Sequence, residues 1–431
     1  MGTSLQLPVF YKLQPALQTY DWGNRGDGII RKFLASQSQE PFAELWMGSH
    51  SKAPAKLSGL IITPQTTTEI NHGSFSDAID FDQAIQENPD HLIGHLHKKG
   101  YTTLPFLFKI LDAARPLSIQ AHPDKQLAET LHKDDPAHYP DANHKPEIAI
   151  SLGQLEAMAG FRHLHEIQND AKRLQPLDSL FFESNQTEKQ PKDSLQQLYT
   201  KIMKSSAHLI QKTADELLQL LQTQKIQNTQ RTQNQTKLDD WFVRLTEIYG
   251  TDDPGVFAIY LLNYITLGKN EAIFLGPNEP HAYLKGEILE CMATSDNVVR
   301  GGLTSKYKDV NTLLSMLSYR SGPVDVIHPT QSANNEDQKL CFNTPADEFQ
   351  VSLLYDDTHT TDTFELEPLS VVLFLSGTAL LKITTSSNTY SYSIDMPQIL
   401  YVPADLYERQ ISLMVNDLSK DARVYAASTR L

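Results

Sequence analysis

The hydrophobic pattern of this chain changes its period twice, and these changes limit the folds that the chain can adopt. Residues 1 to about 155 hold short apolar runs broken by Pro, Gly and Asn, among them LPVFYKLQP and LPFLFKILDA, which are typical of strands. From about 163 to 269 the apolar residues recur instead at helical spacing, as at Leu195, Leu198 and Ile202. Strand patterns then return. We therefore expect a mainly β fold with a helical insertion.

The same pattern divides the chain into three parts, since 431 residues exceed what one hydrophobic core usually serves. One β domain is predicted from residues 1–160 and 270–334, and an inserted all-α domain from 161–269. Residues 335–431, with short strands such as LSVVLFLSG, are predicted to form a C-terminal β domain. Within the insertion, the Gln-rich stretch 223–237 is predicted to be a mobile surface loop.

Charge and cysteine content narrow the classes of partner and compartment. A net charge of -15 argues against binding to nucleic acid or to an anionic membrane, because both attract positive surfaces. Two cysteines, Cys291 and Cys341, are too few for a disulfide framework and indicate a reducing compartment, which we expect to be the cytoplasm. The sequence contains no run of about 18 apolar residues, so we expect no membrane span. An anionic small substrate would need a local cluster of Lys and Arg.

Two segments place polar side chains on one face of a strand. In SIQAHPDK, which begins at Ser118, the side chains of Ser118, Gln120 and His122 alternate with apolar residues and therefore share a face. In HKPEIAI, Lys145 and Glu147 share a face by the same rule. Polar faces of strands are most often open to solvent, so neither segment alone indicates a site.

A third segment, GPNEPHAY, places His281 just after a turn, with Tyr283 on the same face of the strand that follows. Two imidazoles and two oxygen donors from the three segments form a plausible ligand set for zinc or a related divalent ion: Gln120, His122, Glu147 and His281. Each also has an ordinary structural interpretation, such as a turn hydrogen bond for His122 or an ion pair with the neighbouring lysine for Glu147.

A cluster of charges lies in ECMATSDNVVRGGLTSKYKDV. Arg300 precedes a Gly-Gly pair and is followed by Lys306 and Lys308, whereas Glu290 and Asp296 come before it. In an acidic chain, Arg and Lys beside glycines are suited to binding phosphate. The alternative is a surface turn with mixed charges.

Together with AELWMGSH and YDWG, these segments resemble the type I mannose-6-phosphate isomerases, the zinc-dependent phosphomannose isomerases of the cupin superfamily. The resemblance covers the first β domain and the helical insertion, and is weaker over the last third. It implies cupin or jelly-roll β-barrels, the C-terminal one a degenerate structural copy. It also implies an aldose-ketose isomerase that interconverts D-mannose 6-phosphate and D-fructose 6-phosphate through an enediol. Such an enzyme supplies mannose activation to GDP-mannose for glycosylation, or mannose use.

The resemblance also implies roles for particular residues. One zinc ion per chain would be bound by four ligands: Gln120, His122, Glu147 and His281. Catalysis would involve Arg300. The chemistry of the reaction, rather than the resemblance, makes Glu290 and Lys145 the candidates for the base that moves the proton. Glu290 is slightly favoured, because its pKa would need the smaller shift. Substrate would contact Ser118, Tyr283, Lys306 and Trp22, with Ser118 and Lys306 near the phosphate.

Two positions depart from the family pattern, and two other functions are possible. Gly301 stands where Ala is usual and Ser305 where Pro is usual, which affects loop stiffness rather than any functional group. A metal-dependent cupin oxygenase would need only two His and one carboxylate, but Gln120 as a fourth ligand argues against it. A non-catalytic sugar-binding cupin would not need the reactive groups that are present. The expected partner is a sugar phosphate, bound by a monomer.

Overall fold

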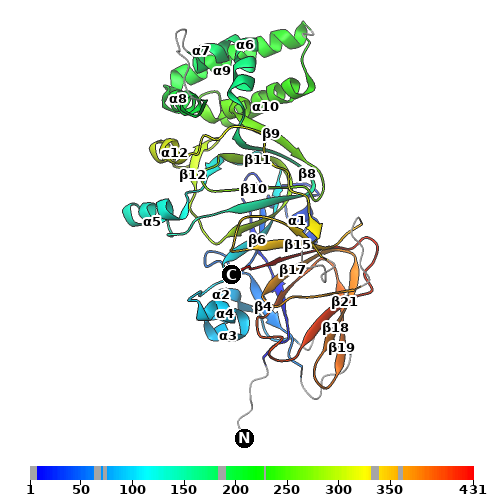
Figure 1. The fold of residues 1–431 in the computed structure, drawn as a ribbon. Helices are drawn as coiled ribbons and strands as arrows, with labels where there is room; N and C mark the ends of the chain where they lie inside the picture. Colours follow the sequence, from blue (N-terminus) through cyan, green and yellow to red (C-terminus); the bar gives the residue numbers. More distant parts are fainter. Residues whose placement is uncertain are drawn as a thin grey trace.

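The computed structural model describes residues 7–62, 69–70, 75–182, 191–227, 230–331, 339–357 and 363–431. Two large sheets and one small sheet are stacked, and a block of helices lies at the end of the molecule opposite to the small sheet (Figure 1). Among the described residues, no helix is both long enough and apolar enough to cross a bilayer.

The first sheet carries most of the candidate site residues. Its strands run in the order β10, β8, β11, β6, β3, β2, while β9 pairs with β8, and β7 pairs with both β11 and β12. All of these pairs are antiparallel. The bounds are β2 (Ala16–Gln18), β3 (Glu44–Met47), β6 (Phe106–Ala113), β7 (Ile119–Ala121), β8 (Glu147–Phe161), β9 (Leu262–Leu267), β10 (Ala272–Leu275), β11 (His281–Ala293) and β12 (Val299–Gly302).

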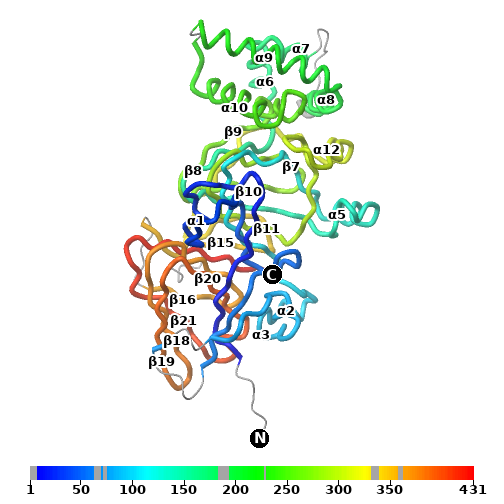
Figure 2. Tube along the Cα trace, turned by 180° about the vertical axis from the view of Figure 1, so that it is seen from behind, coloured from blue at the N-terminus to red at the C-terminus, as the bar shows by residue number. Residues whose placement is uncertain are grey.

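The second sheet joins strands from both ends of the chain, in the order β13, β14, β15, β22, β17, β20, β1, β4, β5 (Figure 2). Its bounds are β1 (Tyr11–Gln14), β4 (Lys56–Gly59), β5 (Ile79–Asp80), β13 (Thr330–Gln331), β14 (Leu340–Phe342), β15 (Gln350–Tyr355), β17 (Ser370–Ser376), β20 (Gln398–Val402) and β22 (Arg423–Ser428). The third sheet is formed by β16 (Thr363–Glu365), β21 (Ser412–Asn416), β18 (Thr378–Thr384) and β19 (Thr389–Asp395).

The centre of the second sheet is buried on both faces, which explains why β17 is apolar from Val371 to Leu375. Val371 and Leu373 belong to the core shared with the first sheet, which also contains Phe108. Val372 and Phe374 belong to the core shared with the third sheet. Successive residues of a strand point to opposite faces, so one continuous apolar run fills two cores.

The helices lie in three places (Figure 1). A cluster beside the second sheet is formed by α2 (Phe81–Glu87), α3 (Pro89–Leu92) and α4 (His95–Lys98). The helical block contains α6 (Leu164–Arg173), α7 (Gln175–Phe181), α8 (Pro191–Lys204), α9 (Ala207–Ile226), α10 (Gln233–Tyr249), the 3₁₀ turn η2 (Pro254–Phe257) and α11 (Ala258–Leu261). Around the first sheet lie α1 (Ile29–Phe33), α5 (Lys125–Asp134) and α12 (Val310–Met316).

The predicted fold class is confirmed: the chain is mainly β with a helical insertion. The paired strands leave both large sheets open at their edges, an arrangement consistent with a jelly roll. The division into domains stays a prediction. The pairing of β1 with β20 adds that the first 80 residues contribute strands to the same sheet as residues 335–431.

The prediction of a mobile Gln-rich loop was wrong for most of residues 223–237. Helix α9 continues to Ile226, and α10 begins at Gln233 behind a Thr232 capping box, in which Thr232 Oγ1 accepts from Gln235 N at 3.2 Å. Gln is a good helix former, so a Gln-rich sequence between two amphipathic helices extends them. Residues 228–229 lie outside the described residues.

Candidate metal centre and active site

Strand β7 brings three of the candidate residues into one row. Gln120 lies directly opposite His281 of β11 on one side and opposite Arg300 of β12 on the other. Residues opposite each other on antiparallel strands project from the same face of the sheet. The shared face that the alternation in SIQAHPDK predicts is therefore present, and it continues across three strands.

Three of the four predicted metal ligands form a buried cluster. The potential ligand atoms of His122, Glu147 and His281 all lie within 4.8 Å of one another, and each residue is at most 3% exposed. Nε2 of each histidine is 3.4 Å from Glu147 Oε2. Apart from these contacts with the carboxylate, neither Nε2 atom has a hydrogen-bond partner among the described residues.

Hydrogen bonds on the far side of each imidazole fix its orientation. His122 Nδ1 lies 2.8 Å from the carbonyl oxygen of Asn297, and His281 Nδ1 lies 3.1 Å from that of Glu279. A carbonyl oxygen can only accept, so each Nδ1 carries the proton and each Nε2 presents a lone pair. Burial also lowers the pKa of His122 to about 4, which keeps this imidazole neutral at pH 7.

The donors of this cluster fit a zinc ion. Two imidazole lone pairs that face a carboxylate oxygen repel it unless a cation lies among them, whereas neutral His and a carboxylate are common zinc ligands. Burial alone would raise the pKa of Glu147, but Lys145 and the histidines hold it well below its usual range, so the carboxylate is ionised. Lys145 Nζ is 3.2 Å from Glu147 Oε1. Gln120 stays a predicted ligand, placed beside the cluster by its pairing with His281.

A cavity of about 830 Å³ opens beside the cluster, and its lining is more cationic than the chain as a whole. Six Lys or Arg and three Asp or Glu line it: Lys52, Lys109, Arg115, Lys145, Arg300, Lys306, Asp21, Glu44 and Asp296. The chain carries a net charge of -15, so this excess of positive charge is local. Such a cavity attracts an anionic substrate.

Arg300 is the lining cation best placed to meet a substrate. Its side chain is half-buried, and its guanidinium makes no hydrogen bond or ion pair with any described residue of the chain. Burial lowers the pKa of Arg300 from its ordinary value, because desolvation penalises the charge. The N–H groups of the Arg300 guanidinium are therefore free to bind an anionic substrate, or the negative charge that develops on it during the reaction.

The remaining predicted site residues separate into two groups. The side chains of Ser118, Trp22 and Lys306 line the cavity, as do Gln120, Lys145 and Arg300. Tyr283 and Glu290 are almost fully buried and are not among the lining residues. Lys308 also lies away from the cavity lining, with its ammonium 3.8 Å from Asp253.

A buried lysine that the sequence analysis missed connects Glu290 to the cavity. Lys109 Nζ lies 3.2 Å from Glu290 Oε2 and 3.6 Å from Glu44 Oε2, and Tyr283 donates to Glu290 Oε1 at 2.9 Å. Burial by itself would lower the pKa of Lys109, but the two carboxylates raise it above its ordinary value. One signal was available: Lys109 is the only charged residue before the aspartate in the apolar run FLFKILDA.

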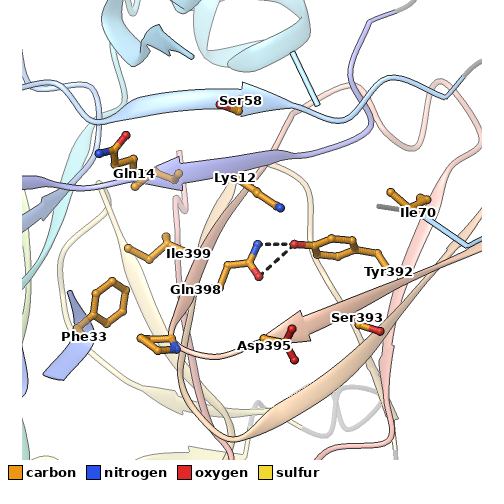
Figure 3. Close-up of a pocket in the computed structure, with 12 residues that line it drawn as sticks. Lys12, Gln14, Phe33, Ser58, Ile70, Tyr392, Ser393, Asp395, Gln398 and Ile399 are labelled. Carbon is orange, nitrogen blue, oxygen red and sulfur yellow. Dashed lines mark hydrogen bonds between the residues drawn. The ribbon is translucent and has the colours of Figure 1, made fainter. Parts of the chain in front are cut away.

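A second cavity, of about 400 Å³, lies between the second and third sheets (Figure 3). Tyr392 and Gln398 hydrogen-bond to each other inside it, and Lys12 lies over the Tyr392 ring at 5.0 Å. Among the described residues, the grouping of His and carboxylate ligands lies behind Gln120 and Lys145 of the first cavity and not here.

Comparisons with known proteins agree with this geometry. The family model for the catalytic domain of type I phosphomannose isomerase matches residues 10–164, and that for the helical insertion domain of the same family matches residues 165–262. Mannose-6-phosphate isomerase 1 of Arabidopsis thaliana is 36% identical over 413 residues, which cover 91% of this chain and 89% of the relative. Mannose-6-phosphate isomerase of Homo sapiens is 37% identical over 402 residues, covering 88% and 90%.

Solved structures are also similar. A mannose 6-phosphate isomerase bound with zinc and yttrium superposes with a TM-score of 0.77 at 26% identity, covering 98% of this chain and 100% of that chain. A mutant of phosphomannose isomerase from Salmonella typhimurium gives a TM-score of 0.76, with the same identity and coverage.

Proposed function

This chain belongs to the type I phosphomannose isomerase family, and we propose that it interconverts mannose 6-phosphate and fructose 6-phosphate in the cavity beside His122, Glu147 and His281. One observation carries the proposal. Two buried imidazole lone pairs face one carboxylate, next to a cavity whose lining is positively charged in an acidic chain. The cluster suits a metal, and the lining suits a sugar phosphate.

The reaction moves one hydrogen from C2 of the open-chain aldose to C1. A base removes the C2 proton, the C1 carbonyl oxygen gains negative charge as the enediol forms, and a proton returns at C1 while the C2 hydroxyl becomes the ketone. The chain must therefore hold the sugar, move a proton and stabilise an oxyanion.

The His122, Glu147 and His281 side chains, with Gln120, would hold one zinc ion per chain. When bound, this ion would act as a Lewis acid toward the sugar oxygens. Arg300, whose guanidinium has no partner in the part of the chain that the structure describes, would stabilise the enediolate by charge and hydrogen bonding.

Of the two candidate bases, the geometry favours Lys145. Lys145 is among the residues that line the cavity, whereas Glu290 is not and contacts it only through Lys109. The Lys145 ammonium is paired with Glu147 at 3.2 Å, so it must first release a proton before it can accept the one from C2. We therefore assign the proton transfer to Lys145, and assign Glu290 to holding Lys109 in place. Lys145→Met should abolish turnover, whereas Glu290→Gln should retain a measurable fraction of it.

The phosphate would lie toward the outer part of the cavity. Lys306 and Arg115, both exposed, line the cavity, and so does Ser118, which is half-buried; Arg115 was not singled out from the sequence. No ion pair of Arg115 or Lys306 is found among the described residues, so both ammonium and guanidinium groups are available to an anion. Trp22, which also lines the cavity, would pack against the sugar.

The test is to purify the protein, measure its bound metal, and follow fructose 6-phosphate formation from mannose 6-phosphate with and without a chelator. Turnover that requires zinc supports the proposal, and zinc-loaded protein without turnover contradicts it. Chelator-resistant turnover would reject the metal role alone. Light scattering of the same sample tests the further proposal that this enzyme is a monomer, and cell fractionation tests the proposed cytoplasmic location.

A further inference from the structure

Two loops beside the metal cluster are bound to each other by an unusually dense set of hydrogen bonds, although neither provides a metal ligand. One loop is residues 141–143, which lead into β8. The other is the turn 294–297, which connects β11 to β12. We call their contact the Asp141 clamp.

The carboxylate of Asp141 makes half of the clamp. Its Oδ1 accepts from Ser295 Oγ at 2.8 Å, and its Oδ2 accepts from the backbone N–H of Asp296 at 2.8 Å. Asn297 Nδ2 donates to the backbone oxygen of Asp141 at 2.7 Å and lies 3.2 Å from its Oδ1. One side chain thus binds three successive residues of the turn.

Asn143 makes the other half. Its Nδ2 donates to the backbone oxygen of Thr294 at 3.0 Å, and its own backbone oxygen accepts from Asn297 Nδ2 at 2.9 Å and from Ser295 Oγ at 3.1 Å. Asn297 is completely buried, so these bonds are protected from competition by water.

The clamp matters because the backbone oxygen of Asn297 is the acceptor that orients His122. His122 lies 175 residues away in sequence, and its Nδ1 is 2.8 Å from that oxygen. The ladder between β12 and β7 begins at Val299, two residues after Asn297, whereas the bonds of the clamp reach Asn297 itself. The same two loops also lead directly to Glu147 on one side and to Arg300 on the other.

We propose that Asp141 is a positioning residue of the metal site: it fixes the turn whose Asn297 carbonyl orients His122, and so sets the affinity for zinc. This inference rests on the proposed function, since it concerns the same metal site. Loss of groups that orient a metal-bound histidine typically weakens metal binding by about 10-fold to 100-fold.

The second histidine provides a matched control. His281 Nδ1 contacts the backbone oxygen of Glu279 at 3.1 Å, but Glu279 is only two residues away, so the chain itself fixes this oxygen. The carboxylate of Glu279 is bound by Arg320 at 2.7 Å, and the Arg320 side chain is 78% exposed. Arg320→Ala removes an ion pair to the Glu279 side chain that is about as short as the bonds of the clamp. It leaves the Glu279 backbone oxygen, which orients His281, in place.

The experiment measures zinc affinity of the full chain by competition with a chromogenic chelator, and the absorption spectrum after loading with cobalt(II). We expect Asp141→Ala and Asn297→Ala each to weaken zinc binding at least about 10-fold and to alter the cobalt bands, because both loosen the turn. Asn297→Ala is informative since it keeps the carbonyl and removes only its anchor. Asp141→Asn, which keeps one acceptor oxygen, should be intermediate, and Arg320→Ala should stay within about 3-fold of wild type.

Leu413→Ala tests whether a general loss of stability could by itself weaken zinc binding. Leu413 is fully buried in β21 of the third sheet, so this change leaves a cavity there. It should lower the melting temperature and leave zinc affinity unchanged. Zinc affinity of the Asp141 and Asn297 variants equal to wild type, or equal to that of Leu413→Ala, would overturn this inference alone. Wild-type protein that binds no zinc would overturn the proposed metal site and this inference with it.

Discussion

Replacing Lys109 by methionine removes the ammonium that lies between the buried carboxylates of Glu44 and Glu290. The Lys109 and Glu290 side chains are 8% and 5% exposed and lie 3.2 Å apart, so the loss of the ammonium leaves a buried carboxylate without its charged partner. Breaking a buried ion pair by removing one member costs about 3–5 kcal/mol of stability. Glu290 keeps its hydrogen bond from Tyr283, so we expect a cost near the lower end, about 3 kcal/mol.

The cost should depend on pH. Burial already raises the pKa of Glu290 above its ordinary value of 4.5, and Lys109 opposes that shift. Without Lys109 the folded-state pKa rises further. A carboxyl with a raised folded pKa contributes stability that is present below its unfolded pKa and is lost as pH rises through the folded value. The deficit of the variant should therefore be small in acid and grow as pH rises.

Urea unfolding at pH 5 and pH 8 measures both effects, with Lys52→Met as the control. Lys52 lies 2.7 Å from Asp296, but its side chain is 59% exposed, so its loss should cost at most about 1 kcal/mol. Adding Glu290→Gln to Lys109→Met should recover part of the loss, because the uncompensated carboxylate is gone. A Lys109→Met deficit no larger than that of Lys52→Met, or one that shrinks as pH rises, would refute the reasoning.

Three further predictions follow from single contacts. Arg300→Ala should lower kcat by about 10²-fold to 10³-fold while metal analysis finds the zinc content unchanged, since no hydrogen bond or ion pair joins its guanidinium to a predicted ligand among the described residues; loss of zinc would make its role structural. Gly301→Ala should lower stability by about 1–3 kcal/mol in a thermal melt, because the new Cβ would lie 2.8 Å from Tyr199 Oη, and Tyr199→Phe in the same chain should restore part of it. Burial raises the pKa of Asp112 from 3.8 to about 6, so the stability that its protonated form contributes is present below pH 3.8 and lost as pH rises through about 6. Asp112→Asn should therefore gain at most about 3 kcal/mol over wild type above pH 6 and nothing below pH 4, measured by urea unfolding; a gain that is independent of pH would contradict this explanation.

The sequence predicted the parts of this fold that depend on local periodicity. The change from strand to helix spacing near residue 163 corresponds to the start of α6 at Leu164, and the alternation around Gln120 corresponds to β7. Periodicity alone could not predict that β1 pairs with β20, because contacts between distant strands depend on which apolar faces meet in the folded chain.

The residues of the candidate site could likewise be predicted where they follow a local pattern, and not where the fold brings distant loops together. Alternation assigned Gln120 and His122 to one face of a strand, and residue type made Glu147 and His281 plausible co-ligands, but only the resemblance to a family favoured that set over the ordinary structural interpretation of each residue. The buried cation Lys109 and the Asp141 clamp were missed for different reasons. Lys109 was visible as a charge in an apolar run, whereas Asp141 and Asn297 lie in polar loops, where Asp and Asn are ordinary turn residues.

The structure also gives the helical insertion a role in the site, through the register of β7. This strand has only three residues, and a slip by one would turn Gln120 away from His281 and Arg300. Its outward residues, Ile119 and Ala121, are almost fully buried in the core of the helical block, which also contains Tyr199. A slipped register would expose this apolar pair to the cavity and bury Gln120 among the helices without partners, which is costly on both counts. The insertion, although it contributes no predicted ligand, therefore holds the wall of the metal pocket in register.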